Sequence, residues 1–121
     1  MSEARIRAYR LGHAAEAAAA LLLLAKGYRL LARRYRTPLG EIDLIVRRGR
    51  TIAFVEVKAR PTLSAALESV GRGAERRIVG AADLWLAKHP GAVGLDLRYD
   101  MVLILPWRLP RHLPDAFRPG W

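Results

Sequence analysis

The sequence contains no cysteine, and it has neither asparagine nor glutamine. The absence of cysteine excludes a disulfide scaffold, thiolate zinc sites and thiol nucleophiles. Long hydrophobic runs are also missing. The longest, residues 17–25, is well short of the roughly twenty apolar residues that a bilayer span needs, and residues 1–13 hold no hydrophobic signal segment. We therefore expect a cytoplasmic protein that is neither exported nor associated with a membrane.

Acidic residues are scarce, with 11 Asp and Glu against 21 Lys and Arg, so the formal net charge is +10 at pH 7. Only three of the basic residues are lysines; the others are arginines, whose planar guanidinium binds phosphate oxygens bidentately. Because 52% of the 121 residues are hydrophobic, this charge belongs to a folded body and not to a disordered tail. The composition predicts a single domain over residues 1–121 whose partner is nucleic acid, with DNA favoured.

Periodicity and turn signals predict the order helix, strand, strand, strand, helix, strand, which fits an α/β fold with a mixed central sheet flanked by helices. We expect a first helix over residues 13–26 and strands over 28–36, 41–47, 51–58 and 95–105. The second long helix, over 75–89, buries a stripe that contains Ile78, Ala81, Ala82, Trp85 and Leu86. Four prolines from about position 106 onward predict a C-terminal tail that continues no strand ladder.

Two acidic side chains interrupt the second predicted strand. Glu41 and Asp43 are two positions apart, so simple alternation places both on one face of the strand. The same alternation places Ile42, Leu44 and Val46 on the other face. This strand therefore presents a pair of carboxylates on one side of the sheet.

The third predicted strand repeats the pattern, because Glu56 and Lys58 share one face of an otherwise apolar segment. If the two strands pair as a hairpin, Asp43 and Glu56 lie side by side. Two bare carboxylates ~4 Å apart would repel by about 4 kcal/mol at an effective dielectric constant of ~20, and a divalent cation removes that conflict. Mg²⁺ or Mn²⁺ suits such oxygen ligands together with a phosphate substrate. Lys58 would then stabilise charge at the reacting phosphate.

These segments resemble the PD-(D/E)xK nuclease signature, in the form that it takes in the YraN-like family of small, largely uncharacterised bacterial proteins. The similarity covers most of the chain and rests on Gly40-Glu41-Ile42-Asp43-Leu44-Ile45, on Phe54-Val55-Glu56-Val57-Lys58, and on residues 12–16, 81–86, 99–102 and 113–117. It implies a restriction-endonuclease-like fold, similar to archaeal Holliday-junction resolvases.

The resemblance also implies roles for particular residues. Asp43 and Glu56 would be metal ligands, Lys58 the catalytic lysine and Glu16 a further acid from the first helix; Glu41 matches the motif. Two positions depart from the family pattern, which has glycine before the helix acid and a Lys-Gln pair at the start of the second long helix. This chain has Ala15 and Ala74-Glu75 there.

Three functions compete for this pattern. The first is a Mg²⁺-dependent endonuclease that cleaves branched or junction DNA by structure, for which a homodimer would supply two symmetric active sites. The second is a nucleic-acid-binding module that keeps the nuclease fold without catalysis, a reading that Ala74-Glu75 favours. The third is an interaction protein, for ribosomal RNA or a protein partner, in which Glu16 pairs with Arg10 or another base and Glu56 with Lys58.

The remaining charged and aromatic residues allow more than one interpretation. Clustered arginines either contact phosphates or form a solvated rim, and we favour phosphate contacts for Arg33, Arg34, Arg36, Arg72, Arg76 and Arg77. The three histidines have no ligand spacing, so we expect surface or helix-cap positions for His13, His89 and His112. Trp85 is expected in the core, whereas Trp107 and Trp121 could pack, dimerise or stack on bases.

Overall fold

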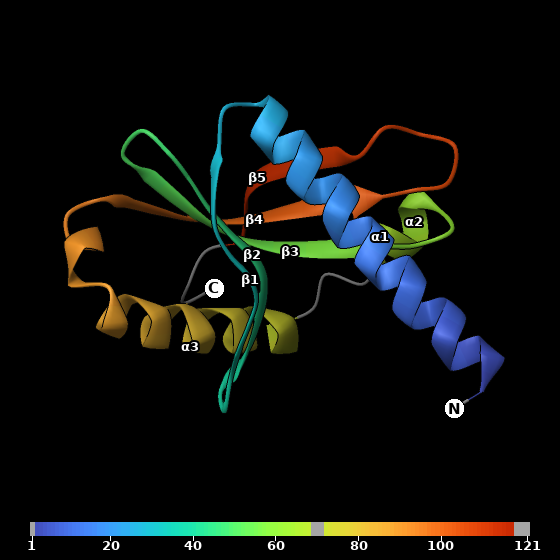
Figure 1. The fold of residues 1–121 in the computed structure, drawn as a ribbon, viewed down its shortest axis with the longest axis horizontal. Coiled ribbons are helices and arrows are strands. Elements are labelled where there is room, and N and C mark those ends of the chain that lie inside the picture. Colours follow the sequence, from blue (N-terminus) through green and yellow to red (C-terminus); the bar gives the residue numbers. More distant parts are fainter. Residues whose placement is uncertain (1, 69–71, 118–121) are drawn as a thin grey trace.

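A computed structural model describes residues 2–68 and 72–117 of the chain. Within them, one mixed sheet has the strand order β1-β2-β3-β4-β5, with helix α1 across one face and helix α3 across the other (Figure 1). This arrangement confirms the predicted α/β class with a mixed sheet flanked by helices. The elements are α1 Glu3–Ala25, β1 Arg29–Thr37, β2 Gly40–Arg48, β3 Thr51–Ala59, α2 Leu63–Glu68, α3 Arg72–Lys88, a 3₁₀ turn Pro90–Ala92, β4 Asp96–Ile104 and β5 Arg111–Phe117.

Helix α1 is longer than the sequence predicted, because it begins at Glu3 and not near His13. It continues through Gly12, a residue that costs about 1 kcal/mol in a helix interior relative to alanine. The helix ends at Ala25, one residue before the predicted limit. Gly27 has φ +93°, and the N–H of Tyr28 donates to the carbonyl of Leu23 at 3.0 Å, which closes the last turn as in a Schellman motif.

The first three strands lie close to their predicted ranges and form an antiparallel meander with short turns. β3 then connects through α2 and α3 to β4, which lies parallel to β3 in the register Thr51 to Asp96 through Ala59 to Ile104. The parallel pairing brings the carboxyl ends of β3 and β4 to the same edge of the sheet. Of the described helices, none is long and apolar enough to cross a membrane.

Each face of the sheet has its own apolar core. The predicted stripe of α3 packs on one face, where Ile78, Ala81 and Ala82 are buried against β-strand residues such as Phe54. Trp85, also on the stripe, is 5% exposed, which confirms its core position. The other core lies beneath α1 and contains Ala19, Ala20, Leu23, Tyr28, Leu44, Val46, Ala53, Val55 and Val102.

The alternation predicted for β2 is wrong at one position. Leu44 and Val46 lie in the core beneath α1, but Ile42 lies with Ile45 in the core beneath α3. Regular alternation cannot place residues three apart on the same face, so the strand is irregular around Asp43. The opposing strand is irregular there too, because Arg34 has φ +49°.

The prediction that the proline-rich end continues no ladder is also wrong. β5 pairs antiparallel with β4 and forms an edge of the sheet, a position where a missing N–H is tolerated. Pro114 falls inside a register irregularity, between the pairs Met101–Leu113 and Tyr99–Phe117, so it removes no ladder hydrogen bond. The proline count was therefore a poor guide to the end of the sheet.

Candidate functional site

Asp43 lies where β2 separates from β3. The paired register of these strands ends at Leu44 and Val55, and beyond it the carboxylate of Asp43 accepts a hydrogen bond from the backbone N–H of Val57 at 2.7 Å. A side chain thus takes the place of a strand partner, which anchors the carboxylate against β3. Two hollows meet at this residue, one on each side of the sheet.

The α3-side hollow has a volume of about 440 Å³. It combines three carboxylates with two guanidinium groups, because β1, β2 and β3 present their side chains toward the first turns of α3. Its lining residues are Arg36, Thr37, Gly40, Glu41, Asp43, Glu56, Arg77 and Ile78. The predicted proximity of Asp43 and Glu56 is confirmed, since both line this hollow.

Gly40 lets the tip of the β1–β2 hairpin approach α3. A Cβ built on Gly40 would lie 2.3 Å from the backbone carbonyl oxygen of Arg77, far inside van der Waals contact. Only glycine therefore permits this approach, which closes one wall of the α3-side hollow.

The α1-side hollow has a volume of about 370 Å³ and is lined by Gly12, Ala15, Glu16, Asp43, Val57, Ala59 and Arg60. It joins the first helix to the site, as the resemblance implied for Glu16. The carboxylate of Glu16 is held by Arg34, whose Nε lies 3.0 Å from both carboxylate oxygens. Arg34, predicted as a phosphate contact, thus has an acidic partner within the chain.

The surroundings of Asp43 disfavour its negative charge. Burial is the main cause and raises the pKa of Asp43 to about 6; the hydrogen bond from Val57 opposes the rise, and the negative charges of Glu16, Glu56 and Glu41 add to it. A carboxyl group with this pKa is stabilised as an anion by any cation that binds beside it.

Glu56 and Lys58 form an ion pair on β3, with Lys58 Nζ 2.9 Å from Glu56 Oε1. The second carboxylate oxygen of Glu56, Oε2, is buried and has no hydrogen-bond partner among the described residues. An unpaired buried carboxylate oxygen is costly, which is the situation that a bound cation would relieve.

These donors fit a hard divalent cation. Asp43 and Glu56 supply oxygen ligands, and Mg²⁺ commonly takes one or two carboxylates and completes its coordination with water and phosphate oxygens. No three His, Asp or Glu side chains within residues 2–68 and 72–117 are grouped closely enough to hold an ion by themselves. The side chains that suit a divalent cation are therefore Asp43 and Glu56, whereas the carboxylate of Glu16 is paired with Arg34.

The arginines predicted as phosphate contacts lie in different places. Arg36 and Arg77 line the α3-side hollow, and Arg36 is 3.6 Å from Glu41. Arg33 and Arg76 are exposed on β1 and α3 and line none of the hollows described here. The side chain of Arg72 lies outside the described part of the structure.

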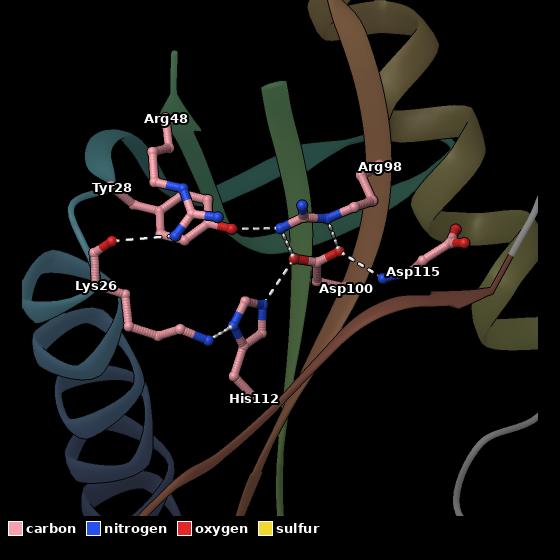
Figure 2. A network of polar contacts seen from close by, with 7 residues as sticks. All are labelled: Lys26, Tyr28, Arg48, Arg98, Asp100, His112 and Asp115. Atoms are coloured by element: carbon pink, nitrogen blue, oxygen red, sulfur yellow. Dashed lines mark hydrogen bonds and ion pairs between the residues drawn. The ribbon is translucent and has the colours of Figure 1, made fainter. Parts of the chain in front are cut away.

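A second polar cluster was missed by the sequence reasoning. Asp100 on β4 is completely buried, and Figure 2 shows its carboxylate between Arg98, His112 and the backbone N–H of Asp115. Burial by itself would raise the pKa of Asp100, but the hydrogen bonds from His112, Arg98 and Asp115 together lower it to about 2. The expected surface position of His112 is therefore wrong, since its side chain is 3% exposed.

This cluster fastens the end of α1 to the last two strands. Arg98 also donates to the hydroxyl of Tyr28, and Lys26 contacts His112 Nδ1 (Figure 2). A sequence signal did exist, because Arg98 and Asp100 are two apart on a strand, as are Glu56 and Lys58. His89, by contrast, lies where a cap was predicted, after the last residue of α3, with its ring stacked on Trp85.

Comparison with known proteins gives the family. The model of the uncharacterised protein family UPF0102 matches residues 15–104, a span that includes Lys58 and the three predicted site acids, Glu16, Asp43 and Glu56. A UPF0102 protein of Chelativorans sp. (strain BNC1) is 56% identical over 119 residues, covering 96% of each chain. The UPF0102 protein of Mesorhizobium japonicum is 54% identical over 116 residues, covering 96% of this chain and 93% of its own. The resemblance to the YraN-like family is confirmed at this level, and the chain belongs to the uncharacterised protein family UPF0102.

Proposed function

We propose that this protein is a divalent-metal-dependent endonuclease of the PD-(D/E)xK type, with a restriction-endonuclease-like fold, that hydrolyses phosphodiester bonds in structured DNA. The observation that carries the proposal is the α3-side hollow, where Asp43 and Glu56 face Arg36 and Arg77. Carboxylates suit a cation and guanidinium groups suit phosphate, so the two charges in one hollow match a metal-bound phosphodiester. The net charge of +10 supports the same class of substrate.

The residues in and next to the hollow would have different chemical roles. Asp43 and Glu56 would hold Mg²⁺ or Mn²⁺, which when bound polarises the phosphate and lowers the pKa of a coordinated water. Arg36 and Arg77 bind the non-bridging oxygens and orient the phosphodiester. Lys58 pairs with Glu56 Oε1, so Oε2 would be the oxygen available to a cation, and the ammonium group of Lys58 would add positive charge near the reacting phosphate. Glu16 and Arg34 would act only indirectly, through the effect of their ion pair on the neighbouring carboxyl group of Asp43.

Hydrolysis adds the oxygen of one water to phosphorus and breaks one ester P–O bond. A proton leaves the attacking water, and the departing alkoxide takes up a proton. Nothing in the described hollows presents a side-chain arrangement for reading base edges, so we expect selection of DNA by backbone geometry and branching.

The decisive experiment is cleavage of a labelled panel of single strand, duplex, flap and four-way junction in Mg²⁺, Mn²⁺ or EDTA. We expect cuts that depend on metal and disappear in Asp43→Ala and Lys58→Ala. The matched control is Asp96→Ala, which removes an exposed acid of β4. Cutting by Asp43→Ala, or by the wild-type protein in EDTA, would show that the activity comes from elsewhere.

A second candidate is a nucleic-acid-binding module without catalysis. Its supporting observation is that Glu16, Glu41 and Glu56 each have a cationic partner within the chain, namely Arg34, Arg36 and Lys58. Absence of cleavage on every substrate, together with DNA affinity that is the same in Mg²⁺ and EDTA, would favour this function over the first.

A further inference from the structure

Trp107 lies in the connection between β4 and β5, and its side chain is fully exposed to solvent at 102% of the reference area. Its backbone has φ +61°, a conformation that a bulky residue rarely adopts. The chain thus holds a tryptophan side chain outward, in a strained backbone conformation, at a place where it contributes nothing to the core. Strain and exposure together at one residue point to a role in binding.

An apolar hollow of about 350 Å³ lies at the base of the same connection. Its walls come from the ends of two parallel strands, which the Ala59–Ile104 pairing and the hydrogen bond from Arg60 N to Ile104 O hold together. Figure 1 shows the β4–β5 connection and the segment that follows β3 at the same end of the sheet. The lining residues are Ala59, Arg60, Pro61, Ile104, Leu105 and Pro106.

The apolar hollow is next to the α1-side hollow of the candidate site. Ala59 and Arg60 line both it and the α1-side hollow, and Asp43 lines the α1-side hollow and the α3-side hollow. A nucleic-acid strand bound at Asp43 would therefore reach Leu105 by way of the α1-side hollow. Arg60 lines both hollows, and the exposed Arg108 and Arg111 bring positive charge to the β4–β5 connection and the start of β5.

We propose that the apolar hollow and Trp107 form a subsite for an unpaired nucleobase of the bound nucleic acid. This inference rests on the proposed function, because it takes the strand at Asp43 as given. A planar base has two apolar faces for Leu105, Pro106 and the indole of Trp107, while the adjoining phosphate meets Arg60. A base within a duplex is stacked on its neighbours and offers no such face, so the subsite selects substrates with unpaired bases.

The charge around the hollow favours this occupant over a second copy of the chain. Two copies, each with a formal charge of +10, would bring like-charged, arginine-flanked surfaces together. A polyanion with exposed bases complements both the charge and the apolar surface. Dissociation of a wild-type dimer on replacement of Trp107 would identify a protein partner and would overturn the proposal.

The test is fluorescence anisotropy of labelled oligonucleotides in EDTA, so that no cleavage occurs. We expect Trp107→Ala to weaken binding of a single strand about tenfold and to change binding of a blunt duplex less than twofold. Trp107→Phe keeps an aromatic face and should bind the single strand within about threefold of wild type. The matched control, Val93→Ala, removes exposed apolar surface elsewhere, at a residue 82% exposed, and should change neither affinity.

An abasic single strand of the same length sharpens the test, because it keeps the phosphates and lacks the bases. Wild type should bind it about as weakly as Trp107→Ala binds the normal strand, and the two losses should not add. Unchanged single-strand affinity of Trp107→Ala, equal losses on single strand and duplex, or no oligonucleotide binding by wild type would each overturn the proposal.

Failure of this inference differs from failure of the proposed function. If Asp43→Ala abolishes metal-dependent cleavage and Trp107→Ala binds the single strand normally, the nuclease stands and the base subsite falls. If no cleavage occurs and Trp107→Ala still loses single-strand affinity, the subsite stands in a protein that binds without cutting.

Discussion

Asp43 should make the protein less stable than an uncharged side chain would. Its pKa is raised from 3.8 to about 6, and each pKa unit corresponds to about 1.4 kcal/mol, so the ionised carboxyl group costs about 3 kcal/mol of folding free energy. Asn in its place can still accept the hydrogen bond from Val57 and carries no charge. We therefore expect Asp43→Asn to raise the free energy of unfolding by about 2–3 kcal/mol at pH 8 without metal.

The gain should depend on pH with a definite sign. Because the pKa of this acid is higher in the folded state than in the unfolded state, the cost is complete above about pH 6. It disappears as the pH falls toward 4, where the folded carboxyl group is protonated and the variant has no advantage. Urea unfolding of wild type and variant in EDTA at pH 8, 6 and 4 measures the difference directly.

The control for this series is Asp96→Asn, which removes an exposed carboxylate and should change stability by less than about 0.5 kcal/mol. The reasoning is refuted if Asp43→Asn is no more stable than wild type at pH 8, or if its advantage persists unchanged at pH 4. Either result would mean that the desolvation and the charges of Glu16, Glu41 and Glu56 do not act on Asp43 as the structure indicates.

Three further outcomes are expected. Mg²⁺ or Mn²⁺ should raise the melting temperature of the wild-type protein but not that of Asp43→Asn, which differential scanning fluorimetry measures. Equal increases in melting temperature for both proteins would place the ion elsewhere. Gly40→Ala should destabilise the fold by about 2 kcal/mol, because the added Cβ meets the backbone of α3. Gly91→Ala is the control and should not destabilise the fold, because no atom lies within 4 Å of its added Cβ. Asp100→Asn should lose about 3 kcal/mol of unfolding free energy, measured in urea at pH 7, because Arg98 loses its buried counter-ion. The deficit should shrink as the pH falls from about 4 to 2 and below, because the carboxyl group of wild-type Asp100 becomes protonated over that range; a deficit independent of pH would contradict this role.

Local signals predicted the parts of the fold that depend on local physics. The stripe from Ile78 to Leu86 predicted the buried face of α3, and periodicity together with turn signals predicted the first three strands. The proximity of Asp43 and Glu56 followed from the hairpin register. These features need only periodicity and pairing between neighbours in the chain.

The features that sequence reasoning missed depend on partners far away in the chain. The carboxylate of Asp43 accepts a hydrogen bond from the backbone N–H of Val57, at the place where the strand alternation breaks and Ile42 lies in the opposite core. Pro114 is tolerated because β5 is an edge strand, and edge position is a property of the whole sheet. His112 is buried because Asp100 and the end of α1 lie across from it, a tertiary contact that no spacing reveals.

The sequential strand order has a consequence for the way the chain folds. The β1–β2 and β2–β3 ladders close through short turns, whereas the β3–β4 ladder must wait for a crossover that contains both α2 and α3. Loop-closure entropy grows with the length of the closed segment, so we expect the meander to form before the crossover docks. Asp43 and Glu56 then come together early and in water, and the wall carrying Arg77 arrives later. The burial that raises the pKa of Asp43 is therefore a late event in folding. Because burying the charged carboxylate is costly, the barrier to completing the sheet should be lower in acid, which protonates this group, or with a cation bound beside it.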